Sequence, residues 1–273
     1  MKKVLLTFGG KEFSQGAFNF AKQLHEQEPI FLTAIFLPDL VYANLWSDGS
    51  GVVIPTYFPK LEEQDQRVKE NMDHFTELCR TNRIACRLHH DYYGLPQDEI
   101  IKETRFADVL IISSETFYKS FAENDLSSNL RDVLHGSECP VIVVPEQFQF
   151  PTKNILFYDG SASSVFAIKQ FYALFPELCR QETVLVYSKD DTDETLPHES
   201  FIQELASLHF QKLEFSKLHF TDNKAITDWI QSKEGVMLVG GAFGRSGFSE
   251  IFRKSFMQDI ITLHKFPVFI AHR

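Results

Sequence analysis

A glycine-rich segment near the C-terminus has residue types that bind phosphate. It runs from Val239 to Ser255 and reads VGGAFGRSGFSEIFRKS, with Gly241 and Gly244 near its start. Because glycine has no side chain, the backbone at such positions can approach a phosphate closely and point its N–H groups at the oxygens. Lys254 places a cation just before Ser255. The segment therefore predicts a phosphate-binding loop.

Two residues of this segment are open to a second interpretation. Ser255, followed by Gln258, fits a capping box, which satisfies the same first amides of a helix that a phosphate needs. Lys254 neutralises a phosphate if its backbone is ordinary, but it costs about 1 kcal/mol and crowds the ligand if a positive φ is required there. Phe252 and Arg253, rather than glycine, precede the lysine, so the segment is not a Walker A loop.

A second polar group lies in the turn Asp159-Gly160-Ser161. The carboxylate of Asp159 can accept hydrogen bonds from a ribose or from the edge of a base. The alternative is structural, because Asp and Ser commonly cap backbone donors where a strand turns into a helix. Capping explains these residue types, whereas their pairing with a distant glycine loop favours binding.

The elements that carry these residues occur twice in the chain. Residues 106–144 align without a gap, at a constant offset, on residues 233–271. The openings repeat as well, since KKVLLTFGG at residues 2–10 resembles KNILFYDGS at residues 153–161. Continuous apolar runs of this kind are typical of parallel strands buried on both faces.

Strands alternate with helices within each repeat, which predicts right-handed crossovers and a mostly parallel, doubly wound α/β sheet. In the first repeat we expect strands at residues 4–8, 30–37, 86–91, 109–113 and 141–144 and helices at residues 14–26, 61–82, 96–105 and 128–135. The second repeat follows the same order with shorter connections. Because ligands bind outside the carboxyl ends of such strands, Asp159 and the Gly241–Gly244 loop are expected to meet in one cleft.

These motifs resemble those of the universal stress protein family. The family's phosphate loop has a glycine, two residues, a glycine, nine residues, a glycine and then serine or threonine. Gly241, Gly244 and Ser255 match this pattern, and Lys254 stands at the third glycine. The Asp159-Gly160-Ser161 turn and the closing ITLHKFPVFIAH also resemble the family.

The resemblance implies two tandem domains with the adenine nucleotide alpha hydrolase-like fold, residues 1–147 and 148–273, joined near PEQFQFPTK. It implies a non-enzymatic stress-response protein that binds an adenine nucleotide such as ATP, with magnesium, in the second domain. The site residues implied are Asp159, Gly160, Val186 against the adenine, Gly241, Gly244, Lys254 and Ser255.

The first repeat has lost most of this motif. Phe8 stands where the aspartate is expected, and Ser114, Phe117 and Ser127 stand at the glycine positions, although Ser128 remains. We therefore expect an intact fold in both repeats and a nucleotide site only in the second.

The resemblance also implies that the repeats pair as an intramolecular pseudo-dimer, because two separate chains do so in single-domain relatives. The final strands, residues 141–144 and 268–270, are expected at or near that contact. Homodimerisation of the whole chain stays open, and the sequence names no protein partner.

Composition bounds the remaining function classes. The 273 residues carry a formal net charge of −10, which argues against non-specific binding to nucleic acid or to an anionic membrane. No apolar run approaches the ~20 residues that span a bilayer, and residues 1–10 are too short an apolar run for a signal peptide. The four cysteines lack metal-site spacing and are expected to be reduced thiols of a cytoplasmic protein.

Neither a catalytic residue nor a metal site is expected. His89 and His90 are adjacent on a predicted strand and so point to opposite faces, and no nucleophile elbow is present. The aromatic insertion at residues 39–60 is either a flap over a cleft or a locally packed loop. The alternative to nucleotide binding is a nucleotide-free tandem stress protein that acts as a protein-interaction scaffold.

Overall fold

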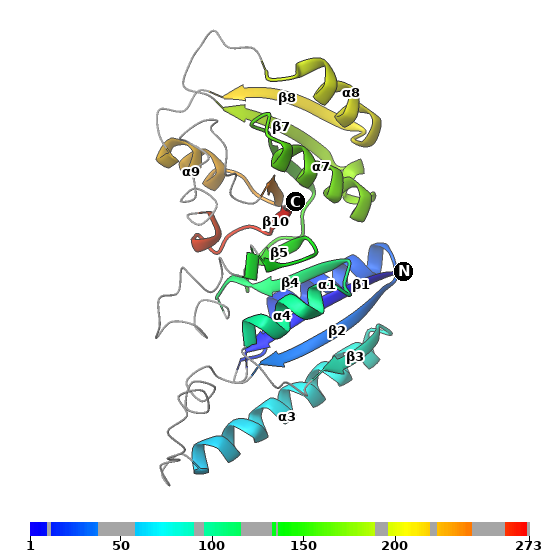
Figure 1. The fold of residues 1–273 in the computed structure, drawn as a ribbon, viewed down its shortest axis with the longest axis vertical. Helices are drawn as coiled ribbons and strands as arrows, with labels where there is room; N and C mark the ends of the chain where they lie inside the picture. The colour runs from blue at the N-terminus through cyan, green and yellow to red at the C-terminus, as the bar shows by residue number, and fades with distance from the viewer. Residues whose placement is uncertain are drawn as a thin grey trace. The chain divides into compact units, whose positions relative to one another are not determined.

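The computed structural model (Figure 1) describes residues 1–9, 12–37, 58–89, 96–115, 133–134, 136–188, 196–218, 223–241 and 260–271. By its internal contacts the chain divides into two compact units, Met1–Cys139 and Pro140–Arg273. Each unit combines strands of parallel sheet with packed helices.

In its described residues, the first unit has the strand order β3-β2-β1-β4, with every pair parallel. Its elements are, in chain order, β1 (Lys2–Gly9), α1 (Gln15–Gln27), β2 (Ile30–Leu37), α3 (Phe58–Thr81), β3 (Ala85–His89), α4 (Pro96–Thr104) and β4 (Val109–Ser113). Every residue of β4 is buried, as expected for a strand that is covered on both faces.

The second unit has the strand order β5-β10-β9-β6-β7-β8. β5 pairs antiparallel with β10, and the other pairs are parallel. The elements are β5 (Val141–Val144), β6 (Lys153–Phe157), α7 (Ala162–Leu174), the 3-10 helix η2 (Leu178–Arg180), β7 (Glu182–Ser188), α8 (Glu199–His209), β8 (Lys212–Leu218), α9 (Asn223–Gln231), β9 (Val236–Gly241) and β10 (Val268–Ala271).

The mostly parallel, doubly wound α/β fold predicted from the sequence is confirmed. The order β3-β2-β1-β4 of the first unit returns as β8-β7-β6-β9 in the second. The strands predicted to close the two repeats pair with each other, Val268 opposite Val143. β5 therefore falls in the second compact unit although it ends the first repeat, and the domain boundary after residue 147 stays a prediction.

Two predicted segments need comment. α3 begins at Phe58, so the last residues of the predicted 39–60 insertion are helical rather than irregular. Residues 39–57 lie outside the described residues, as does most of the helix predicted at 128–135. Whether the insertion forms a flap thus stays a prediction.

Capping serines begin the first helix of each unit. Ser14 Oγ accepts a hydrogen bond from the Ala17 amide at 3.0 Å, and Ser161 Oγ accepts one from the Ser164 amide at 3.1 Å. Each side chain satisfies an amide that has no partner within its helix. Residues 10–13 separate the end of β1 from Ser14, and residues 158–160 separate the end of β6 from Ser161, so the two segments are of similar length.

Phe8, near the end of β1, lies at the centre of an aromatic cluster in the first unit. Its ring centroid is 4.6 Å from that of Phe13 and 4.9 Å from that of Phe36, both stacked. The Phe75 ring meets it edge to face at 6.0 Å. Phe8 is fully buried. The cluster ties the end of β1 to β2, α3 and the chain that enters α1.

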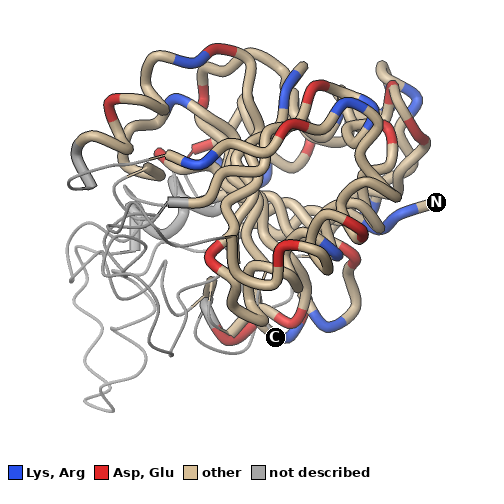
Figure 2. Tube along the Cα trace, turned by 90° about the horizontal axis from the view of Figure 1, so that it is seen from above, with Lys and Arg blue, Asp and Glu red and all other residues tan. Residues whose placement is uncertain are grey.

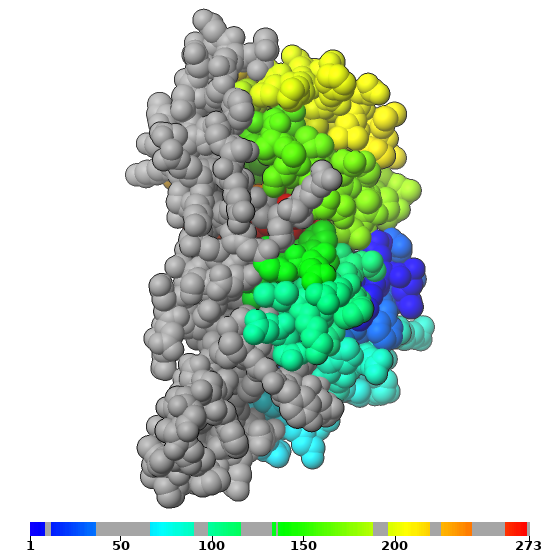
Figure 3. Space-filling model, viewed as in Figure 1, coloured from blue at the N-terminus to red at the C-terminus, as the bar shows by residue number. Residues whose placement is uncertain are grey.

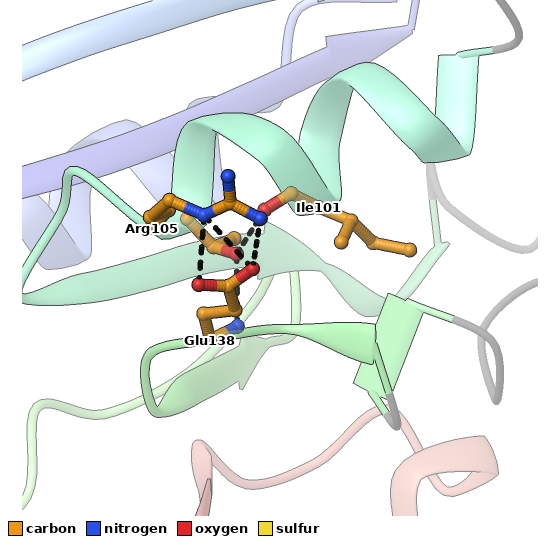
Figure 4. A network of polar contacts seen from close by, with 4 residues as sticks. Ile101, Arg105 and Glu138 are labelled. Carbon is orange, nitrogen blue, oxygen red and sulfur yellow. Dashed lines mark hydrogen bonds and ion pairs between the residues drawn. The ribbon is translucent and has the colours of Figure 1, made fainter.

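A polar network holds the turn at Glu138 against the end of α4 (Figure 4). The Arg105 guanidinium donates to both carboxylate oxygens of Glu138, with distances from 2.6 to 3.0 Å. Thr104 Oγ1 accepts from the Glu138 amide at 2.9 Å and donates to the Ile101 carbonyl. Hydrogen bonding to Arg105 lowers the pKa of Glu138. The network positions the chain just before β5.

The described surface is polar with a few exposed apolar side chains. Lys and Arg alternate with Asp and Glu along the described trace (Figure 2). α8 lies at the surface of the second unit (Figure 3), where Phe201 and Leu208 are exposed. Among the described helices, none has the length and apolar character needed to cross a membrane.

The aromatic cluster predicts a large stability difference between two phenylalanines. Phe8→Ala is expected to lower the free energy of unfolding by about 3–5 kcal/mol, because it removes a ring from a closely packed core. Phe106, which is 63% exposed, is the matched control, and Phe106→Ala should change stability by less than about 0.5 kcal/mol. Urea unfolding followed by circular dichroism measures both. Equal effects of the two substitutions would contradict the role of Phe8.

Candidate functional site

The carboxyl ends of β7, β6 and β9 bring the described candidate residues of the second unit to one edge. Phe157 is paired with Val186 on one side, and Leu156 is paired with Val239 on the other. Asp159 follows β6, Val186 lies in β7, and Gly241 ends β9. The strand register therefore brings Asp159 and Gly241, the start of the glycine loop, to the same edge of the sheet, as the sequence predicts.

Asp159 forms the capping turn that the sequence offered as the structural alternative. Its Oδ1 accepts a hydrogen bond from the Ser161 amide at 2.9 Å, and Ser161 in turn caps α7. This turn uses one carboxylate oxygen. Within the described part of the chain, Oδ2 of this half-buried side chain has no hydrogen-bond donor. Capping and ligand binding by Asp159 are therefore compatible.

Gly160 is required by the backbone. Its φ is +79°, a left-handed conformation that side chains disfavour, and a Cβ atom there would lie 2.6 Å from Pro197 Cβ. This turn accounts for glycine at position 160 without a ligand, and a binding role for Gly160 stays a prediction.

Gly241 is required by packing. A Cβ atom at this position would lie 2.7 Å from the carbonyl carbon of Ser163 and 2.9 Å from its oxygen. The end of β9 thus rests against the first turn of α7, which leaves no room for a side chain. Close helix packing explains this glycine, and its contact with a phosphate stays a prediction.

Two tyrosines next to these residues were missed by the sequence analysis. The Tyr158 amide donates to the Val186 carbonyl at 3.0 Å, which continues the β6–β7 ladder and sets Tyr158 beside Tyr187. The Tyr158 hydroxyl donates to the Pro197 carbonyl at 2.8 Å. The Tyr187 hydroxyl is buried and has no hydrogen-bond partner among the residues that the structure describes. A tyrosine within an apolar strand resembles a core residue. The sequence therefore does not indicate that the Tyr158 hydroxyl has a hydrogen-bond partner and the Tyr187 hydroxyl has none.

The two hydroxyls lie within electrostatic reach of Asp159. Burial raises the pKa of Tyr158 and of Tyr187, and the negative charge of Asp159 raises both further. The Val186 side chain is 1% exposed, and its predicted contact with an adenine stays a prediction. The polar atoms at this edge are therefore a carboxylate oxygen and a neutral, unpartnered phenol, both of which suit hydrogen bonding to a polar ligand.

The corresponding edge of the first unit is apolar. Phe8 aligns with Asp159 in the sequence, but the strand registers place it level with Phe157, because Leu6 pairs with Ile111 as Ile155 pairs with Leu238. The rings of Phe13 and Phe36 stack on Phe8. Ser114, which aligns with Gly241, is buried and donates to Glu115 at 2.7 Å. The aromatic rings occupy the region next to the strand end, in agreement with the loss of motif residues in the first repeat.

The rest of the predicted phosphate loop lies outside the described residues. This applies to Gly244, Lys254 and Ser255, and to Phe117, Ser127 and Ser128 of the first repeat. Whether Ser255 caps a helix or contacts a phosphate thus stays open. In the described residues no group of three or more His, Cys, Asp or Glu side chains could hold a metal ion. His89 Nδ1 lies 2.7 Å from Glu103 Oε1.

Comparisons with known proteins agree with the resemblance to universal stress proteins. No protein-family model matches the chain. The universal stress protein Slr1230 of Synechocystis is 23% identical over 179 residues, which cover 60% of this chain and 62% of the relative. The chain thus spans about three fifths of the length of that relative.

A solved structure has the same fold over the entire chain. A universal stress protein from Archaeoglobus fulgidus covers 100% of this chain and 96% of its own, with 16% identity and a TM-score of 0.70. A universal stress protein family protein from Arabidopsis thaliana with AMP bound covers 52% of this chain and 90% of its own at 15% identity, but its TM-score of 0.32 carries no structural argument. The universal stress protein fold is confirmed.

The packing of Gly241 gives a stability prediction. Gly241→Ala is expected to lower the free energy of unfolding by about 1–3 kcal/mol, because the added methyl overlaps the backbone of Ser163. Urea unfolding measures the loss.

A second substitution tests the reason for that loss. Since the overlap is with backbone atoms, adding Ser163→Ala should not restore the stability of Gly241→Ala. Recovery in the double variant would show that only the Ser163 hydroxyl is crowded, and that the backbone approach does not require glycine.

Proposed function

We propose that this chain, which has the universal stress protein fold, is a non-enzymatic stress-response protein that binds an adenine nucleotide in its second unit. The nucleotide is ATP or a related adenine nucleotide, with magnesium as its counterion. The site lies at the carboxyl ends of β6, β7 and β9. The four free cysteines support a reducing compartment such as the cytoplasm as its place of action.

The observation that carries the proposal is a buried hydroxyl without a partner beside a half-buried carboxylate at this edge. The Tyr187 hydroxyl is buried without a partner in the described part of the chain. The half-buried Asp159 carboxylate beside it has one oxygen, Oδ1, that accepts from the Ser161 amide. A buried polar group without a partner costs about 1–3 kcal/mol. A bound nucleotide, whose base and ribose carry donors and acceptors, would satisfy both groups.

Each candidate residue has a distinct role in this proposal. Asp159 accepts a hydrogen bond from the ribose or the base, and Val186 lies under the adenine. The chain after Gly241 carries the phosphates, with amides at Gly244 and the start of the helix at Ser255. Lys254 neutralises phosphate charge in place of the family's glycine. None of these residues is assigned a catalytic role.

Removing the charge of Asp159 tests the site. Asp159→Asn keeps the oxygen that accepts from the Ser161 amide, so the turn before α7 should persist. Loss of the charge-assisted hydrogen bond should weaken nucleotide binding by about 1.5–3 kcal/mol, roughly 10- to 100-fold. Isothermal titration with ATP and magnesium measures the affinity.

The matched control is Asp228→Asn, which removes the same charge from an exposed residue of α9. Its affinity should equal that of the unmodified protein. Absence of nucleotide from the denatured protein, together with no binding near ~1 mM, about 4 kcal/mol, would reject the proposal.

Tyr187 and its neighbour Tyr158 separate ligand binding from stability. Tyr187→Phe removes a hydroxyl with no partner, so the nucleotide-free protein should be as stable as before or more stable. Tyr158→Phe removes a hydrogen bond to Pro197 and should cost about 1 kcal/mol. If the nucleotide satisfies Tyr187, only Tyr187→Phe combines undiminished stability with an affinity roughly 5- to 10-fold weaker. Unchanged affinity in Tyr187→Phe would remove this residue from the site.

A second candidate function is a nucleotide-free tandem protein that acts through protein partners. It is favoured by the structural explanations of Gly160 and Gly241, both of which satisfy local packing without a ligand. The same titration decides between the two candidates, because the scaffold requires that ATP, ADP and AMP all fail to bind.

A further inference from the structure

The Tyr187 hydroxyl, which the proposed nucleotide would satisfy, is not accessible from solvent. Tyr187 is 3% exposed, and its hydroxyl is buried without a partner in the described part of the chain. Tyr158, which lies beside it, is 1% exposed. A ligand that hydrogen-bonds to Tyr187 must therefore first displace part of the protein.

Residues 196–198, which lead into α8, contact the turn that carries Asp159. The Tyr158 hydroxyl donates to the Pro197 carbonyl at 2.8 Å. The Pro197 ring lies so close to Gly160 that a Cβ atom on this glycine would be 2.6 Å from Pro197 Cβ and 3.1 Å from Pro197 Cγ. Pro197 thus contacts both sequence neighbours of Asp159, one through its carbonyl and the other through its ring. Residues 196–198 are called the strap below.

A single hydrogen bond fastens the strap to this turn. Burial raises the pKa of Tyr158, so its hydroxyl keeps the proton that it donates to Pro197. Within the described part of the chain, no second hydrogen bond joins the strap to residues 158–160. Because a buried hydroxyl that loses its partner is unfavourable, this bond favours the closed position of the strap.

The other end of the strap is strained. His198 has a φ of 51°, in the left-handed region that side chains disfavour. It occupies the N-cap position of α8 but makes no side-chain cap hydrogen bond. The amides of Phe201 and Ile202 both donate to its carbonyl, at 3.0 and 3.1 Å. The strain at His198 opposes the closed position, so it lowers the free energy needed to lift the strap.

We infer that the strap is a hinged gate over the nucleotide site, which the hydrogen bond from Tyr158 to Pro197 holds closed. The strap opens to let the nucleotide reach Asp159 and Tyr187, and it closes again in the complex. This inference rests on the nucleotide binding proposed above. Tyr158 is a positioning residue in it, because it acts through Pro197 and does not contact the nucleotide.

A gate has a kinetic signature that a ligand contact does not share. The nucleotide passes the strap both when it enters and when it leaves, so the closed strap slows association and dissociation by the same factor. The dissociation constant is then independent of the hydrogen bond that holds the strap. A residue that contacts the nucleotide instead changes the dissociation constant.

Tyr158→Phe tests the gate, because it keeps the ring and removes only the hydroxyl. Loss of one hydrogen bond should make the open strap roughly 5-fold more populated, which corresponds to about 1 kcal/mol. The rate constants are measured by stopped-flow mixing with magnesium and an ATP that carries a fluorophore on its γ-phosphate. We expect association and dissociation to become roughly 5-fold faster together, with an unchanged Kd.

A second variant and a matched control accompany this measurement. Pro197→Ala keeps the carbonyl that accepts from Tyr158 but removes the ring from Gly160, so it should also raise both rate constants. Tyr172→Phe removes a hydroxyl from α7 and keeps the ring, which stacks on His209 with centroids 3.6 Å apart. Its rate constants should equal those of the unmodified protein.

Amide hydrogen exchange tests the strap without a nucleotide. The hydrogen bonds of the Phe201 and Ile202 amides end on His198, so they open when the strap lifts. In Tyr158→Phe these two amides should exchange roughly 5-fold faster than in the unmodified protein. In Tyr172→Phe they should exchange at the unmodified rate.

The outcomes separate this inference from nucleotide binding itself. If the unmodified protein binds ATP but Tyr158→Phe changes neither the rate constants nor the amide exchange, the gate is refuted and nucleotide binding stands. Faster dissociation alone, with a larger Kd, would make Tyr158 a ligand contact and would also refute the gate. If the unmodified protein fails to bind ATP near ~1 mM, nucleotide binding is refuted and the gate falls with it.

Discussion

The hydrogen bonds on both sides of the central strands, β1 and β6, are the constraint on which the rest of the structure depends. β6 is held between β7 and β9, and β1 between β2 and β4. Because side chains alternate across a strand, a slip of one residue would turn the buried set to the opposite face. Asn154 opposes that slip, because its buried side chain would lose the hydrogen bonds that it donates to the Leu178 carbonyl and to Thr183 Oγ1. The register set by the core then decides which residues emerge at the carboxyl edge.

The two central strands end in different chemistry. Near the end of β1 the buried ring of Phe8 stacks on Phe13 and Phe36 and stabilises the first unit. Just after β6 the chain places Asp159, next to a tyrosine whose hydroxyl has no partner among the described residues. An unpartnered buried hydroxyl lowers stability, and a ligand at this edge would remove that cost.

Much of the fold could be predicted because continuous apolar runs determine buried parallel strands. The Asp159 turn was also predictable, since Asp, Gly and Ser each have a local reason to be there. The start of α3 had a signal that was not used, because Pro59 suits the first turn of a helix. No sequence signal indicates the unpartnered hydroxyl of Tyr187, since the absence of a partner among the described residues depends on neighbours distant in sequence.

The glycines and the buried cysteines of this chain both show that a residue type alone does not indicate function. Gly160 and Gly241 are both required by the protein's own packing, so their presence does not distinguish a binding loop from a tight turn. The burial of Cys139 and Cys179 likewise explains those thiols without a reaction. What packing leaves unexplained is different in kind: a buried phenol in the second unit that has no partner among the described residues and lies beside a carboxylate. Function is better sought at such atoms than at residues that match a motif, because local stability already accounts for the latter.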